Sequence, residues 1–154
     1  MPLFDETIPK AERLPKFAHW VSSYFKHGDL LTHNVDNLEY KFPDQTRNSV
    51  VSTLAPEELN SMVDYEAPWL ADTSLLTKFE TPLFDQMCKA LFDPVTRSLW
   101  PNLGIWVLYC NSSPGVTIHA AWGVEKLAKE NKDQPVQFLP IEGAHHLVRN
   151  LPSS

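Results

Sequence analysis

The chain has 154 residues, of which 43% are apolar and 21% charged, and its formal net charge is −6 at pH 7. This apolar fraction is enough to build one ordinary hydrophobic core, so we expect a folded protein rather than a disordered one. Lysine and arginine form no cluster, and the overall charge is negative. The sequence therefore contains no basic patch that would attract nucleic acid or anionic membranes, and neither is expected as a partner.

The sequence favours a reducing, intracellular compartment. Its only cysteines are Cys88 and Cys110, and the first residues lack the basic region and apolar stretch of a secretory signal. No apolar run approaches the roughly 20 residues needed to cross a bilayer. We therefore expect a soluble, cytoplasmic protein.

Residues 1–98 predict a series of short helices. After Pro15, the apolar residues between positions 17 and 25 recur at helical spacing, which predicts a helix that Gly28 ends. Asp29 is a suitable N-cap for a second helix, which would reach Pro43. A third would begin at Pro56, and further helices are expected over residues 69–78 and 82–92.

The pattern changes from residue 99 onward. Residues 105–110, with the sequence IWVLYC, form a continuous β-prone run, which predicts a strand covered on both faces near the centre of a sheet. A helix over 118–128 and a second strand over 135–141 complete a βαβ unit with parallel strands. The fold class is therefore α/β. Because no convincing strand precedes this unit, the sheet is expected to be incomplete.

The order of these elements is similar to that in a known family. The succession of Leu99-Trp100-Pro101, the strand 105–110, Ser112-Ser113-Pro114, the helix with Ala120-Ala121-Trp122, the strand 136–141 and Glu142-Gly143-Ala144-His145-His146 resembles the C-terminal third of α/β-hydrolases. The helical half, which opens with residues 9–15, resembles the lid and following region of fungal AK-toxin biosynthesis hydrolases. The resemblance covers nearly the whole chain. It implies a partial α/β-hydrolase fold, with a lid-like region over 1–98 and the C-terminal βαβ part of the core over 99–154.

The resemblance also implies a catalytic residue. In this family the catalytic histidine lies on the loop beyond the last strand, within Gly-Ala-x-His, and this role falls on His146, with His145 in the variable position before it. Loops at the carboxyl ends of parallel strands are where open α/β sheets assemble such groups. The alternative interpretation of His146 is an ordinary polar residue near the end of the chain.

The other two members of a catalytic triad are not identified. None of the five glycines flanks a serine in a Gly-x-Ser-x-Gly elbow, and the family's nucleophile precedes the lid. Serine stands where many relatives carry the acid, and neither Asp64 nor Asp72 is singled out by its spacing. We therefore expect a truncated relative of hydrolases that act on apolar esters or thioesters in fungal secondary metabolism, and expect it to be inactive alone.

No metal or cofactor is expected, because His19, His27 and His33 fit no zinc-binding spacing. His119 is interpreted as a surface or capping residue, and Ser112 and Ser113 as an N-cap before a first-turn proline. One group of aromatic side chains could line an apolar substrate pocket or form the core, namely Trp20, Tyr24, Phe25, Trp69 and Phe79.

A non-catalytic binding protein is the competing hypothesis for function. Such a protein would pair through an exposed sheet edge or its lid, either as a homodimer or with a full-length relative. In a third hypothesis, a complementing hydrolase fragment associates with the chain and supplies the serine, so that a complete hydrolase is rebuilt. Relatives often end in a peroxisomal tripeptide, but Pro152-Ser153-Ser154 is not one, so the cytoplasm remains the expected location.

Overall fold

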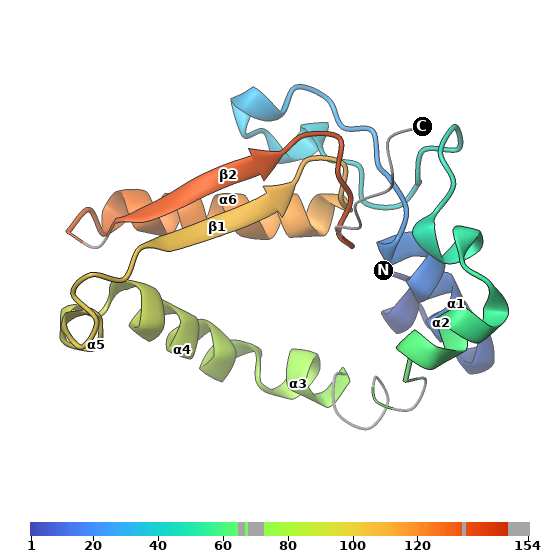
Figure 1. Ribbon diagram of the computed structural model, residues 1–154, viewed down its shortest axis with the longest axis horizontal. Coiled ribbons are helices and arrows are strands. Elements are labelled where there is room, and N and C mark those ends of the chain that lie inside the picture. Colours follow the sequence, from blue (N-terminus) through green and yellow to red (C-terminus); the bar gives the residue numbers. More distant parts are fainter. Residues whose placement is uncertain (65–66, 68–72, 134, 148–154) are drawn as a thin grey trace. The chain divides into compact units, whose positions relative to one another are not determined.

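The structure is a computed structural model of the chain, and it describes residues 1–64, 67, 73–133 and 135–147. It is a mixed α/β protein with a parallel sheet in which strands β1 and β2 are neighbours (Figure 1). This confirms the predicted α/β class and the parallel pair. The predictions for Trp69, for Asp72 and for the C-terminal tripeptide lie outside the described residues.

The chain divides into two compact units. Unit 1 comprises Met1–Ala55, Leu108–Gly123 and Leu139–Ser154, and unit 2 comprises Pro56–Val107 and Val124–Phe138. In chain order the elements are α1 (Lys10–Val21), α2 (Pro56–Met62), α3 (Thr73–Lys78), α4 (Glu80–Phe92), α5 (Pro94–Ser98), β1 (Ile105–Cys110), α6 (Gly115–Glu130) and β2 (Val136–Ile141). Within the described residues, no helix is both long and apolar enough to span a membrane.

Helix α1 differs from the prediction at both ends. It begins at Lys10 and contains Pro15, and it ends at Val21 rather than continuing through Phe25. Serine side chains explain the end, because the Ser23 hydroxyl donates to the carbonyl of His19 at 2.6 Å and so takes up an orphan helix carbonyl. Trp20, Tyr24 and Phe25 are nevertheless buried, so these three aromatics belong to the core, whereas Phe79 is exposed.

The second predicted helix is replaced by two separate 3-10 turns, Leu30–Thr32 and Val35–Asn37. Asp29 and Asn34 each accept a hydrogen bond from the backbone two residues later, which favours a local turn over a continuous helix. Between the two turns, His33 has φ 50°, in the left-handed region that ends helices.

The remaining helices of the first half follow the prediction more closely. Helix α2 begins at Pro56 as expected, α4 covers the predicted range 82–92, and α3 covers the described part of the range 69–78. Helix α5 was not predicted. It begins with Pro94 after Asp93, whose carboxylate accepts from the Thr96 N–H at 2.7 Å, so it has an ordinary capped start.

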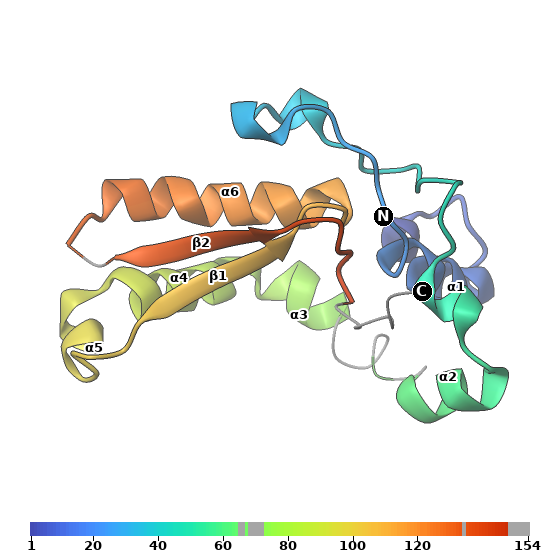
Figure 2. The ribbon, with the colours of Figure 1, turned by 45° about the horizontal axis from the view of Figure 1, so that its top comes forward.

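The β1–α6–β2 unit confirms the predicted order and the range of β1, whereas α6 extends beyond the predicted 118–128 at both ends and β2 begins one residue later than predicted. The prediction that β1 is covered on both faces is wrong. Exposure alternates along the strand, and Trp106 and Leu108 are 55% and 57% exposed. Tyr109, at an alternate position, packs against a buried cluster that includes Ile118 and Trp122 of α6. Helix α6 lies along the strands (Figures 1 and 2). The side chains of Trp106 and Leu108, which alternate with Tyr109 along β1, leave an apolar face exposed.

The first turn of α6 packs closely against the segment 38–40 within unit 1. The Gly115 N–H donates to the Glu39 carbonyl at 2.9 Å, and Leu38 packs in the same buried cluster as Ile118. A Cβ atom on Gly115 would lie 2.8 Å from the Glu39 oxygen, closer than atoms can approach without a shift of the backbone. Glycine is therefore required here by contact rather than by φ.

This contact predicts opposite effects for two glycines of one helix. We expect Gly115→Ala to lower the free energy of unfolding by about 1–3 kcal/mol, because the added methyl overpacks the contact with Glu39. A Cβ atom on Gly123 would have open space within 4 Å, so Gly123→Ala should raise stability by about 0.5–1 kcal/mol. Chemical denaturation of both variants measures the difference, and equal effects would contradict the packing of residues 38–40 on α6.

Candidate functional site

The turn after β1 and the loop after β2 are hydrogen-bonded to each other within unit 1. The Asn111 N–H donates to the Ile141 carbonyl at 3.1 Å, and the Asn111 side-chain oxygen accepts from the Gly143 N–H at 2.7 Å. The Ser112 N–H donates to the Ala144 carbonyl at 3.0 Å. Residues 142–147, called the histidine loop below, are therefore fixed at the carboxyl ends of both strands, where open α/β sheets place functional groups.

The two histidines of this loop have different environments. His146, the predicted catalytic residue, is exposed, whereas His145 is only 3% exposed. The His145 ring meets Tyr24 edge to face with centroids 4.6 Å apart, and its Nδ1 accepts from the Leu147 N–H at 3.0 Å. The neutral ring therefore carries its proton on Nε2. Burial lowers the pKa of His145, and the charges of Arg47 and His146 lower it further.

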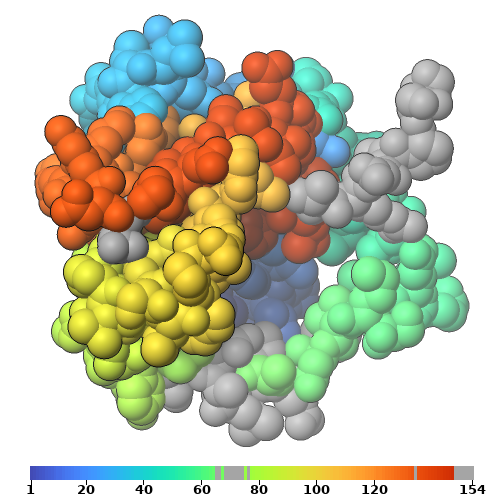
Figure 3. All heavy atoms as spheres, turned by 60° about the vertical axis from the view of Figure 1, so that its left-hand side comes forward, coloured from blue at the N-terminus to red at the C-terminus, as the bar shows by residue number. Residues whose placement is uncertain are grey.

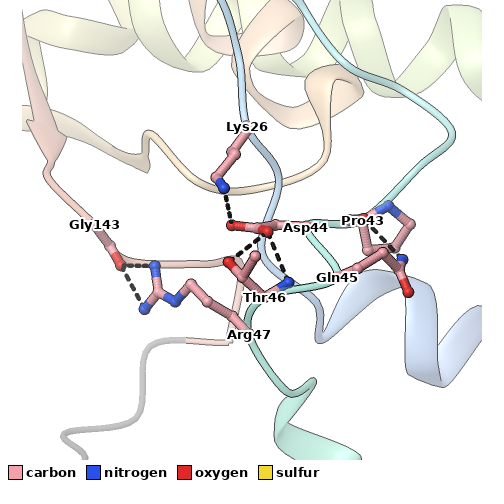
Figure 4. A network of polar contacts seen from close by, with 7 residues as sticks. All are labelled: Lys26, Pro43, Asp44, Gln45, Thr46, Arg47 and Gly143. Atoms are coloured by element: carbon pink, nitrogen blue, oxygen red, sulfur yellow. Dashed lines mark hydrogen bonds and ion pairs between the residues drawn. The ribbon is translucent and has the colours of Figure 1, made fainter.

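Arg47 joins the histidine loop to the N-terminal part of unit 1 (Figure 4). Its guanidinium carbon lies 3.3 Å from the centre of the Tyr24 ring, and both terminal nitrogens lie 3.4 Å from the Gly143 carbonyl oxygen. Asp44, in the same network, is engaged elsewhere, because it accepts from both the N–H and the hydroxyl of Thr46 and pairs with Lys26 at 3.3 Å. The hydrogen bonds from Thr46 lower the pKa of Asp44 and keep it ionised.

A second histidine fastens the turn after β1 to the N-terminal segment. His27 Nδ1 accepts from the Glu39 N–H at 2.9 Å, so the neutral ring donates through Nε2 to the Ser113 carbonyl at 2.8 Å. The Phe25 N–H donates to the Ser112 carbonyl at 2.9 Å. Burial is the main cause that lowers the pKa of His27. This arrangement makes His27 a structural bridge rather than a ligand.

The other histidines weighed as metal ligands lie with separate partners. His19 Nδ1 is 2.8 Å from the Ser49 hydroxyl, and the His33 ring stacks on Trp122 with centroids 4.8 Å apart. His119 is exposed, and its Nδ1 is 3.3 Å from the Tyr40 hydroxyl. Within the described ranges, no three His, Cys, Asp or Glu side chains are placed to share a metal ion.

The serines and the described carboxylate considered for catalysis are not assembled around His146 by any described contact. Ser113 is buried just before α6, and its N–H donates to the Cys110 carbonyl, consistent with a turn-forming role. Ser112 is engaged through its backbone, and Asp64 lies exposed in the helical half. The sequence did not point to Arg47 or to the anchoring role of Asn111, because each acts on Gly143, which is 96 and 32 residues away in the chain.

Unit 2 carries a separate surface cavity of about 370 Å³. Its lining comes from the segments 94–105 and 133–137 and includes Arg97, Trp100 and Asp133. Figure 3 shows the face on which the first segment, in yellow, borders the second, in orange-red. The Arg97 guanidinium there donates to the Leu103 carbonyl at 3.2 Å. No described contact links this cavity to a histidine.

Comparisons with known proteins identify no relative of this chain: no family model matches it, and neither a curated protein nor a solved structure matches it.

The two buried histidines predict how stability depends on pH. Their pKa values in the folded protein lie below the ordinary value of 6.5, so the unfolded chain binds protons more readily as pH falls. Stability from the neutral rings is complete above about pH 6.5 and is lost as pH falls below it toward the folded pKa values. We expect urea denaturation to show a lower free energy of unfolding at about pH 5.5 than at about pH 7.5.

In the His27→Gln variant, the free energy of unfolding should depend less on pH than in the wild-type protein. An unchanged pH dependence would contradict the role of His27.

The hydrogen bond from Gly143 to Asn111 predicts how the histidine loop is held. Asn111→Leu removes the acceptor, and we expect faster hydrogen exchange at the Gly143 amide by roughly fivefold, corresponding to about 1 kcal/mol for one lost hydrogen bond. Asn111→Asp keeps an acceptor oxygen and serves as the matched control, with slow exchange retained. If both variants exchange like the wild-type protein at Gly143, Asn111 does not anchor the loop.

Proposed function

We propose that the chain is the C-terminal part of an α/β-hydrolase related to the fungal AK-toxin biosynthesis hydrolases, with the lid-like region over 1–98 and the core part over 99–154. One observation carries this proposal. The turn after β1 and the histidine loop after β2 are hydrogen-bonded together, and they hold His146 at the carboxyl ends of two parallel strands. In open α/β sheets this is the position at which catalytic loops gather.

In this proposal His146 is the general base and His145 is a positioning residue. Histidine is the side chain that most often transfers protons in catalysis, and the exposed ring of His146 is open to a nucleophile brought to it. His145 is buried against Tyr24 and accepts a hydrogen bond from the Leu147 N–H, so it fixes the loop on both sides of His146. The proposed substrates are apolar esters or thioesters of secondary metabolism.

We propose that these 154 residues alone do not hydrolyse a substrate. The sequence contains no Gly-x-Ser-x-Gly elbow. Of the two serines after β1, Ser113 is buried, and the N–H and carbonyl of Ser112 are both engaged in hydrogen bonds. A histidine without a nucleophile and without oxyanion donors accelerates acyl transfer very little. The nucleophile would have to come from a polypeptide segment outside this sequence.

A non-catalytic binding protein of the cytoplasm is the second candidate, and the open face of β1 favours it. Trp106 and Leu108 are more than half exposed, although parallel sheets are normally covered on both faces. Among the described residues β1 has no strand neighbour other than β2, and an uncovered apolar strand with such an edge is a site for pairing with another strand. The partner would be a second copy of the chain or a full-length relative.

Hydrolysis of p-nitrophenyl butyrate by the purified chain tests the first proposal. We expect no turnover above the rate with His146→Ala, since the sequence supplies no elbow nucleophile. Turnover in the wild-type chain that His146→Ala abolishes would contradict the stated inactivity and would confirm the role of His146. Turnover that persists in His146→Ala would contradict both.

The oligomeric state of the same sample separates the two candidates. A monomer in sedimentation analysis is expected for the hydrolase part. A dimer that Leu108→Lys dissociates, while Val116→Lys on the exposed side of α6 does not, would instead favour the binding protein. Val116 is 45% exposed and so is a matched site for the same charge.

A further inference from the structure

We propose that Arg47, held over Tyr24 beside the histidine loop, binds a carboxylate group of the ligand. Arg47 is exposed, and its guanidinium contacts both Tyr24 and the Gly143 carbonyl. All of these residues belong to unit 1. Figure 4 shows the guanidinium pointing toward Gly143 and away from the Lys26–Asp44 pair.

The guanidinium is held in place before any ligand arrives. Its carbon is 3.3 Å from the centre of the Tyr24 ring, which is a close cation–π contact. Tyr24 is itself only 7% exposed, its carbonyl accepts from the Asp44 N–H at 2.7 Å, and its ring packs on His145. Because the arginine rests on a buried ring, a ligand would lose little of its binding energy to ordering this side chain.

The hydrogen-bonding capacity of Arg47 is largely unused. A guanidinium has five N–H donors, and the Gly143 carbonyl takes two contacts at 3.4 Å, which are long for hydrogen bonds. Asp44 is the carboxylate of the same network, and it is engaged by Thr46 and Lys26 instead. Among the residues that the structure describes, Arg47 forms no ion pair with a carboxylate. The site therefore has a cation and donors to offer to an anion.

The chemistry of the site favours a carboxylate over a phosphate. A planar guanidinium matches the two oxygens of a carboxylate in a bidentate pair. A phosphate dianion gathers several cations or backbone N–H groups, but the neighbouring ammonium of Lys26 is already paired with Asp44. One available guanidinium on an aromatic ring is suited to a single negative charge.

The position of the site connects it with His146. Gly143, whose carbonyl Arg47 contacts, is three residues before His146, so the two lie within about 11 Å along the chain. A carboxylate bound by Arg47 would place the rest of the ligand beside the histidine loop. This link to His146 rests on the proposed function, and it makes the substrate an apolar ester or thioester with a separate carboxylate. The binding of a carboxylate by Arg47 can be measured without assuming the proposed function.

The test is a titration of the full chain with hexanoate, followed by NMR at the Gly143 and Ala144 amides and the Arg47 Nε–H. Hexanamide is the matched neutral compound, and inorganic phosphate is the alternative anion. Arg47→Ala removes the cation. Arg47→Lys keeps the positive charge but loses the planar guanidinium that forms the bidentate pair. Arg97→Ala is the control variant, because Arg97 also donates to a backbone carbonyl but belongs to unit 2.

We expect saturable shifts with hexanoate and none with hexanamide. Affinity should fall at least about tenfold in Arg47→Ala, as for the loss of a charge-assisted hydrogen bond, less in Arg47→Lys, and not at all in Arg97→Ala. Equal binding of hexanamide, equal affinity in Arg47→Ala or tighter binding of phosphate would each overturn the proposal. If Arg47→Ala fails to fold, Arg47→Lys and the hexanoate–hexanamide comparison still decide it. Because no hydrolysis is measured, these outcomes are independent of the esterase assay.

Discussion

The turn from Asn111 to Gly115 is the constraint on which the rest of unit 1 depends. Its backbone groups form hydrogen bonds to the histidine loop at Ala144, to the N-terminal segment at Phe25 and His27, and, from the start of α6, to Glu39. Buried backbone groups without partners are costly, so these bonds form as a set. The N-terminal segment is therefore bonded to the same turn that holds the histidine loop. The helical half of the sequence completes the candidate site as well as preceding it.

The same set of contacts gives two adjacent histidines different environments. His145 engages its Nδ1 with the Leu147 N–H and packs its ring on Tyr24, so its position is determined by packing. His146 points out of this packing and is exposed. Two residues of one type thus receive different environments from a single turn, in which Gly143 takes φ 68°. The residue available for chemistry is the one that the packing leaves open.

The sequence predicted the elements that a continuous apolar pattern determines, and missed those that a polar side chain determines. Strands β1 and β2 and helix α6 follow from runs and periods of apolar residues. The apolar period also continued through Phe25, but Ser23 ends α1 earlier by bonding to the His19 carbonyl. For the candidate site, the resemblance to α/β-hydrolases pointed to His146, and this assignment remains a prediction. The sequence pattern could not indicate Arg47, because nothing local to Arg47 shows that it meets Gly143 and Tyr24 in space.

The apolar sequence of β1 does not by itself mean that both faces of the strand are covered. Residues 105–110 are apolar enough for a strand buried on both faces, yet the covering contacts described lie on one side, and Trp106 and Leu108 remain open. Two parallel strands with one uncovered face are seldom stable without further strands. The hydrolase proposal and the binding-protein proposal therefore share one physical requirement, which is more polypeptide beside β1. They differ in what that polypeptide carries: a nucleophile that can reach His146 makes the site catalytic, and a strand without one makes the same edge an interface.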